Sequence, residues 1–239
     1  KQSFYEFMDK VHKKLTSWSP AIFIGYNNIN FDEKFLRSSF YQSLYAPYLT
    51  NTNNNTRSDL FKIILTICNL EKSYLNIPID KEKGRKILKL EKLAENNNIE
   101  HKFAHDAMSD VDATLGIAEL IKTNDPELWE HLMVFRSHNN VSDFIEKNKI
   151  CIMPPTTSNG EYTPVGHLTS NPDNPKELIF FNLNEIVTDD ILNSRTRNIG
   201  GLFKSKILKK VKSNDFPIFL LPEHLNNSKR EKFSENIKE

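Results

Sequence analysis

The stretch "AIFIGYNNINFDEKF", residues Ala21–Phe35, decides the fold of the first half of the chain. Its short apolar run ends at Gly25, which is typical of a buried strand whose carboxyl end opens into a polar loop. Helical spacing of apolar residues resumes from Glu33 to Tyr45, with Asp32 in place to cap this helix. A strand followed by a helix predicts an α/β domain, in which ligands bind beyond the carboxyl ends of the strands.

Helical spacing of apolar residues recurs on both sides of this unit. We expect four further helices, at Phe4–Leu15, Leu60–Leu70, Leu88–Asn96 and Ala107–Lys122. The apolar stripe of the last one is predicted to comprise Val111, Leu115, Ala118 and Ile121, with Asp106 near its cap. The polar stretch "NTNNNTRSD", which precedes Leu60, is predicted to form a loop.

The character of the sequence changes after Asp125-Pro126. From there on, strand-like runs are separated by Pro, Gly, Asn and Asp, namely "ICIMPP", "YTPVGHLTS", "ELIFFNLNEI" and "FPIFLL". A chain of 239 residues is long enough for two domains, each with its own core. We therefore expect an α/β domain over residues 1–125 and a mostly β domain over residues 126–239.

Composition narrows the classes of function. Lys plus Arg number 32 and Asp plus Glu number 31, so the whole chain creates no strong field toward nucleic acid or a membrane surface. No apolar run approaches the roughly 20 residues that span a bilayer, and the start lacks a signal-peptide pattern. We expect a soluble, cytoplasmic monomer without a membrane partner. Cys68 and Cys151 are expected to be buried free thiols.

A second polar stretch, "AHDAMSDVDAT", combines a histidine with several acids. His105 precedes the expected helix and Asp110 lies about one turn inside it, so both side chains can face one site. A carboxylate there can bind Mg²⁺, and a nearby imidazole can accept a proton from water, a combination suited to phosphodiester hydrolysis. Simpler interpretations remain open, because acids favour helix starts and Asp32 with its asparagines fits a capped turn.

Taken together and in this order, the two stretches resemble the exonuclease I family of 3′→5′ single-strand DNA exonucleases, which belong to the DEDD class. "GYNN-x-x-FD" resembles the second exonuclease motif of that family, and "AHDAM-x-D" resembles the third. The likeness includes "R-S-D-L", "L-K-L-E-K-L" and "N-I-E-H" between them, and "HLTSNPDNPKELIFFNLNEI" beyond them. It implies an α/β, ribonuclease H-like exonuclease domain followed by a mostly β, SH3-like domain.

The resemblance also implies roles for individual residues. His105 would be the general base, and Asp110 and Asp32 would be metal ligands at a site with two Mg²⁺ ions. Histidine suits this task because its ordinary pKa lies near 6.5. The expected reaction releases 5′-mononucleotides from the 3′ end of single-stranded DNA, in DNA repair or recombination. Single-stranded DNA is the expected partner, and we add a single-strand DNA-binding protein as a candidate.

Further positions match residues that contact DNA in this family. Arg37 is expected to bind phosphate, and Tyr48 to stack on a base or hydrogen-bond. Lys89 stands where the family has arginine, which keeps the charge but loses bidentate geometry. A basic stretch offers a track for a DNA backbone through Lys204, Lys206, Lys209, Lys210 and Lys212. The alternative interpretation is solvent-exposed charges and one aromatic that packs in a loop.

One expected motif is missing from the sequence. A DEDD enzyme needs Asp-x-Glu on an early strand, but this chain has that pattern only at Asp80-Lys81-Glu82 and Asp125-Pro126-Glu127. Neither lies on an apolar strand ahead of Asp32, so we expect that the opening strands of the sheet are missing. By the same resemblance, we expect that a C-terminal helical domain is missing as well. We therefore expect the chain alone to be inactive. Two alternatives remain: a non-catalytic single-stranded DNA-binding module, and a DEDD exonuclease that acts on RNA.

Overall fold

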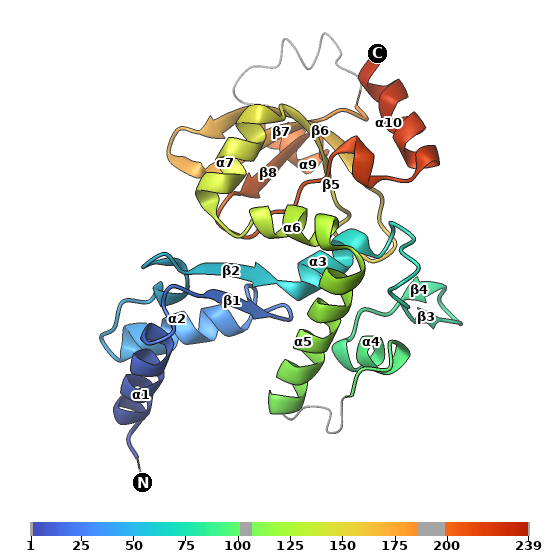
Figure 1. The fold of residues 1–239 in the computed structure, drawn as a ribbon. Coiled ribbons are helices and arrows are strands. Elements are labelled where there is room, and N and C mark those ends of the chain that lie inside the picture. Colours follow the sequence, from blue (N-terminus) through green and yellow to red (C-terminus); the bar gives the residue numbers. More distant parts are fainter. Residues whose placement is uncertain (1, 101–106, 186–198, 239) are drawn as a thin grey trace.

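The computed structural model describes residues 2–100, 107–185 and 199–238 (Figure 1). In the first half, two short strands, a β-hairpin and five α-helices follow one another in the described ranges. Their bounds are α1 Phe4–Thr16, β1 Ile22–Gly25, α2 Asp32–Gln42, η1 Leu49–Asn51, β2 Thr56–Asp59, α3 Leu60–Ile67, β3 Ile79–Asp80, β4 Arg85–Lys86, α4 Leu90–Asn96 and α5 Ala107–Asn124. The expected helices and the expected strand within Ala21–Asn27 are therefore present, with shifts of a few residues at their ends. The prediction that this strand is buried is wrong, because Ile22 is 49% exposed and the other residues of β1 are only half-buried.

Strand β2 corrects the prediction of a loop before Leu60. The last four residues of "NTNNNTRSD" pair in parallel with β1, in a register that places Gly25 opposite Asp59. Arg57, Ser58 and Asp59 are almost completely buried although all three are polar. Hydrophobic periodicity does not reveal such a strand, because the burial of its side chains depends on hydrogen-bond partners elsewhere in the chain.

Two expectations about the helices are wrong in detail. Phe31 is the N-cap residue of α2 and Asp32 is its first helical residue, so the Asp32 carboxylate does not cap the helix. In α5, Ala118 and Ile121 are buried as predicted, but Val111 is 48% exposed and Leu115 is 51% exposed. The buried face instead begins with Ala113, Thr114 and Ile117. A Cβ atom on Gly116 would lie 2.6 Å from the side chain of Ile99, so α5 approaches Ile99 closely at this glycine.

The second half begins with two helices that the sequence did not predict. They are α6, Pro126–Val134, and α7, His138–Lys147. Asp125 starts α6 because its carboxylate accepts a hydrogen bond from the backbone N–H of Leu128 at 3.3 Å, with Pro126 at the first helical position. Thus Asp125-Pro126 starts a helix as well as ending the preceding one.

A four-stranded antiparallel sheet follows, as predicted for a mostly β region. The remaining elements are β5 Ile150–Met153, β6 Thr163–Asn171, β7 Asn174–Asn182, α9 Ile199–Lys204, β8 Leu208–Lys212, η3 Pro222–His224 and α10 Asn227–Lys238, with the strands in the order β5-β6-β7-β8. The run "FPIFLL" adds only an isolated bridge between Ile152 and Leu220. Cys68 and Cys151 are free and buried, as expected.

One hydrophobic core connects the two halves. A continuous cluster of buried side chains extends from Ile29 and α3 through α5 and α6 to Phe219 and Phe233. Figure 1 shows α6 between the four-stranded sheet and α3. A separate small cluster of Met8, Phe40 and Leu49 joins α1 to α2. The division of the chain into two domains at residue 125 therefore stays a prediction. None of the described helices combines the length and apolar character that crossing a bilayer requires.

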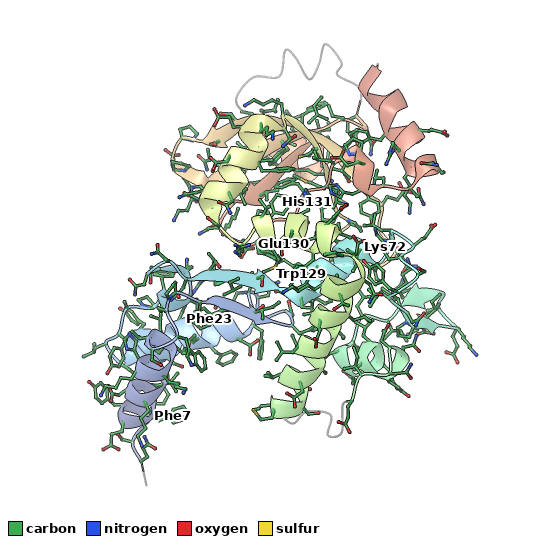
Figure 2. The ribbon with its side chains drawn as sticks, in the orientation of Figure 1. Phe7, Phe23, Lys72, Trp129, Glu130 and His131 are labelled. Carbon is green, nitrogen blue, oxygen red and sulfur yellow. The ribbon has the colours of Figure 1, made fainter. Side chains whose placement is uncertain are left out.

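Two histidines meet where α6 packs against η3. The centroids of the imidazole rings of His131 and His224 are 4.1 Å apart. The Phe219 carbonyl oxygen accepts a hydrogen bond from Nε2 of His131 at 2.8 Å. Figure 2 labels His131 on α6, and Lys72, which pairs with Asp125 at the start of the same helix. Burial, reinforced by the neighbouring His224, lowers the pKa of His131 to about 4. Burial also lowers the pKa of His224.

Acid is therefore expected to weaken the fold at this junction. The folded-state pKa of His131 lies below its unfolded value, so protonation favours the unfolded chain, and stability is lost as pH falls from about 6.5 toward 4. Between pH 7.5 and 5, His131 alone should lower the free energy of unfolding by about 2 kcal/mol. Urea unfolding at both pH values measures this loss.

His131→Phe should remove that part of the pH dependence, whereas Glu130→Gln, a change of an exposed carboxylate on the same helix, should retain it. An equal pH dependence in wild type and His131→Phe would contradict the assignment to His131.

Candidate active site at the carboxyl ends of β1 and β2

Asp59 holds the loop that follows β1. This carboxylate is fully buried at the end of β2, and it accepts hydrogen bonds from the backbone N–H groups of Asn27 at 2.8 Å, Ile29 at 3.3 Å and Phe61 at 3.0 Å. Burial raises the pKa of Asp59, and the three backbone hydrogen bonds oppose that shift. One side chain thus joins the carboxyl ends of both strands and caps α3.

Sequence reasoning did not select Asp59 as a site residue. The sequence analysis includes Asp59 only as the end of the predicted loop "NTNNNTRSD" and within "R-S-D-L", one of the matching segments. A usable signal was present, because an aspartate directly before an apolar helix is a start signal. The hydrogen bonds that Asp59 accepts from Asn27 and Ile29 could not be predicted in this way, because they leave no pattern in the sequence around Asp59.

Within this loop, Gly25 and Asn28 are in close contact. A Cβ atom on Gly25 would lie 2.7 Å from Cβ of Asn28, so the glycine is required for this approach. Asn27 takes a left-handed backbone conformation, with φ of 59°. Asn28 is only 8% exposed, and its Oδ1 has no hydrogen-bond donor within the described ranges. The loop therefore presents a buried acceptor beside the start of α2.

Tyr26 connects the same loop to the start of α4. Its hydroxyl donates to the carbonyl oxygen of Leu88, and its ring meets Phe61 edge to face at 5.6 Å. Lys89, the next residue after Leu88, is the exposed N-cap residue of α4. Lys89, one of the three predicted DNA contacts, thus directly follows a residue whose carbonyl oxygen is hydrogen-bonded to the loop after β1.

The other two predicted DNA contacts are brought together. The guanidinium of Arg37 lies over the ring of Tyr48, 5.1 Å from its centroid, and Nη2 of Arg37 donates to the carboxylate of Glu33 at 3.3 Å. Tyr48 is 52% exposed. An arginine stacked on an exposed aromatic ring is a surface suited to a phosphate and a base.

The predicted metal ligands lie at the starts of two helices. Asp32 is exposed at the first position of α2, and Asp110 is half-buried in the first turn of α5. Neither belongs to a group of three or more His, Cys, Asp or Glu side chains in the parts of the chain that the structure describes. The predicted base, His105, and the predicted cap, Asp106, lie outside the described residues.

Both Asp-x-Glu patterns have structural uses. Asp80 accepts from the backbone N–H groups of Glu82 and Lys83 in the β3–β4 turn, at 3.0 and 3.1 Å. Asp125 caps α6, and its carboxylate pairs with Lys72 at 2.7 Å. These contacts account for both aspartates without a metal.

The basic stretch is only partly available to a ligand. Lys209 donates to the hydroxyl of Thr163 at 3.0 Å, and burial lowers the pKa of Lys209. Lys210 pairs with Glu177 at 3.3 Å. The exposed members that remain are Lys204, Lys206 and Lys212. The interpretation as a DNA track therefore applies to fewer charges than the sequence suggested.

Comparisons with known proteins identify relatives of this chain. No family model matches the chain. Exodeoxyribonuclease I of Buchnera aphidicola (from Schizaphis graminum) is 39% identical over 146 residues, which is 61% of this chain and 30% of that protein. Exodeoxyribonuclease I of Haemophilus influenzae is 30% identical over 225 residues, 85% of this chain and 47% of that protein.

Two solved structures cover almost the whole chain. The crystal structure of E. coli exonuclease I with a dT13 oligonucleotide matches 97% of this chain and 53% of its own, with a TM-score of 0.82 and 26% identity. An ExoI/SSB-Ct complex matches 99% of this chain and 55% of its own, with a TM-score of 0.83; at 24% identity it shows the fold alone.

These matches confirm the predicted fold, a ribonuclease H-like exonuclease domain followed by an SH3-like domain. The chain spans between about a third and a half of the length of the curated relatives it matches. By sequence and by fold, these 239 residues belong to the exonuclease I family.

Proposed function

We propose that this chain is part of a 3′→5′ exodeoxyribonuclease that degrades single-stranded DNA to 5′-mononucleotides. The observation that carries the proposal is the loop of "GYNN", which Asp59 holds at the carboxyl ends of two parallel strands, directly before Asp32. This is where open α/β sheets bind their ligands. Membership of the exonuclease I family supplies the reaction.

In this proposal His105 is the general base, and Asp32 and Asp110 are ligands of Mg²⁺. Carboxylates are suitable ligands for Mg²⁺, and a pair of ions would stabilise the attacking and leaving oxygens. Two carboxylates are too few for such a pair, and the described residues contain no larger group of ligands. The fit is therefore incomplete, and we propose that these 239 residues alone do not hydrolyse DNA.

The proposed substrate contacts are Arg37 and Tyr48 together, with Lys89 as a separate contact on α4. The stacked Arg37–Tyr48 pair supports this assignment, because it combines a cation with an exposed aromatic ring. E. coli exonuclease I has been crystallised with oligonucleotides, and a related complex contains SSB-Ct. We propose single-stranded DNA as the substrate and a single-strand DNA-binding protein as a partner of the complete enzyme.

The test compares this chain with a longer protein that contains it and an upstream Asp-x-Glu strand. Each is incubated with Mg²⁺ and a 5′-labelled single-stranded oligonucleotide, and the products are separated by length. The longer protein should shorten the DNA progressively from its 3′ end, whereas the 239-residue chain should bind the DNA and leave it intact.

Each other outcome identifies an alternative. Progressive shortening by the 239-residue chain would contradict the need for the missing acids. Binding without hydrolysis by the longer protein would favour a non-catalytic DNA-binding module. Faster digestion of a matched RNA would favour the RNA exonuclease.

A further inference from the structure

The carboxylate of Glu33 joins two arginines beside the proposed DNA contacts. Its Oε2 accepts from Nη2 of Arg37 at 3.3 Å, from Nη1 of Arg57 at 3.2 Å and from the hydroxyl of Thr50 at 2.7 Å. Glu33 is 4% exposed. We call these four residues the Glu33 cluster. A buried carboxylate with three donors is held firmly, and it holds its partners in turn.

The cluster continues into the loop after β8. Nη2 of Arg57 donates to the carbonyl oxygen of Asn214 at 2.7 Å. Lys62 donates to the carbonyl oxygen of Asp215 at 2.5 Å, and its amino group lies 3.5 Å from the Asp215 carboxylate. Two cations, on Arg37 and Arg57, thus share the single carboxylate of Glu33, which leaves one positive charge in excess at this pair, while Lys62 pairs with Asp215.

The excess charge is accessible at Arg37. The Arg37 side chain is 29% exposed, whereas that of Arg57 is 6% exposed. Nε of Arg37 is buried and has no acceptor among the residues that the structure describes. A guanidinium has five N–H donors in a rigid fork, and an unpaired buried donor is costly. An anion that approached the exposed side of Arg37 would accept from the donors of the fork that face solvent.

We propose that Glu33 is a positioning residue that orients Arg37 as a phosphate subsite for single-stranded DNA. Glu33 fixes one edge of the fork while Tyr48 supports its face, so the remaining donors are ordered before the phosphate arrives. Through Arg57, the same carboxylate ties this subsite to the loop that follows Lys212. The proposal rests on the proposed function for the identity of its ligand.

The first experiment measures binding of the 239-residue chain to labelled oligothymidine by fluorescence anisotropy across a salt series. Glu33→Gln should weaken binding about fivefold at low salt and reduce the slope of log affinity against log salt by about 0.7, the loss of one phosphate contact. Arg37→Ala should have the same effect, and the double variant should add nothing further, because both changes remove one contact.

Glu119→Gln is the matched control, because it removes the same charge from an exposed position on α5. It should leave binding unchanged or slightly stronger, the opposite sign from Glu33→Gln. If Glu33→Gln behaves like this control while wild type binds DNA, the positioning role is wrong and the proposed function stands.

Glu33→Gln leaves Arg57 buried without its partner, so its folding is checked by circular dichroism and urea unfolding. If it does not fold, Arg37→Lys takes its place: it keeps the charge but loses the fork, and it should lower affinity by a similar factor. Affinity and salt slope equal to those of wild type in Arg37→Lys would overturn the subsite.

A second measurement does not depend on DNA. The Nε–H resonance of Arg37 is followed by NMR while inorganic phosphate is added to wild type and to Glu33→Asp. This variant keeps the carboxylate but shortens the side chain that carries it by one methylene group. The resonance should shift in wild type and shift less in Glu33→Asp. Should wild type fail to bind DNA, the proposed function fails, and the absence of a phosphate-induced shift would overturn the subsite as well.

Discussion

Asp59→Ala is expected to lower the free energy of unfolding by about 3 to 5 kcal/mol. The change removes the acceptor of three backbone N–H groups, those of Asn27, Ile29 and Phe61, at a position that water does not reach. Each buried donor left without a partner costs about 1 to 3 kcal/mol. Asp59→Asn keeps one acceptor oxygen and should lose roughly half as much. Urea unfolding measures both losses.

The same substitution should release the loop of the candidate active site before the protein unfolds globally. In Asp59→Ala, hydrogen exchange at the amides of Asn27 and Ile29 should accelerate more than exchange at Ile63 in α3. Asp80→Ala is the matched control, because Asp80 also accepts from backbone N–H groups, two instead of three, but does so in an exposed turn. Its cost should stay within about 1 kcal/mol. Equal costs for Asp59→Ala and Asp80→Ala would contradict the role given to burial.

His105→Ala is expected to reduce the turnover of the complete enzyme by about 10²-fold or more, the scale of losing a general base. Asp110→Asn should cause a loss at least as large, because a neutral amide is a poor ligand for Mg²⁺. The measurement is the rate of mononucleotide release from single-stranded DNA at saturating substrate, with binding determined separately so that the loss can be assigned to turnover.

Asp112→Asn is the control for both changes. Asp112 lies on the same first turns of α5 as Asp110, and its side chain is exposed. Its substitution should leave turnover within about twofold of wild type, as expected of a surface change. Full activity in His105→Ala would show that His105 is not the general base. Equal losses of turnover in Asp110→Asn and Asp112→Asn would show that Asp110 acts only through its charge and not as a metal ligand.

The parts of the fold that the sequence predicts are determined by residues within each element, whereas the missed parts depend on partners far away in the chain. The strand ending at Gly25 and the helices α1 to α5 follow from the spacing of their own apolar residues, although β1 has no fully buried residue and α1 buries only Met8. Strand β2 was missed because Arg57 and Asp59 are buried through bonds to Glu33, Asn27 and Ile29. Those partners lie 24 to 32 residues away, and spacing within β2 carries no sign of them.

The candidate site shows the same division. Motif order and spacing selected Asp32, His105 and Asp110, but they could not select Asp59, which holds the loop, or Glu33, which holds Arg37. Both are acids that the sequence alone could assign to helix starts. The basic stretch shows the opposite error, because Lys209 and Lys210 resemble ligand contacts in sequence and are used within the sheet.

The shared core also constrains how this chain can exchange parts with its relatives. Ile29, Trp129 and Phe219 belong to one buried cluster although they come from both sides of residue 125. A recombinant made by crossing two homologous genes at that point would combine core residues that were selected in different partners. Cavities and overpacked contacts would result, each costing stability. Gene exchange within the family should therefore favour crossovers that transfer α3, α6 and the strands around Phe219 together.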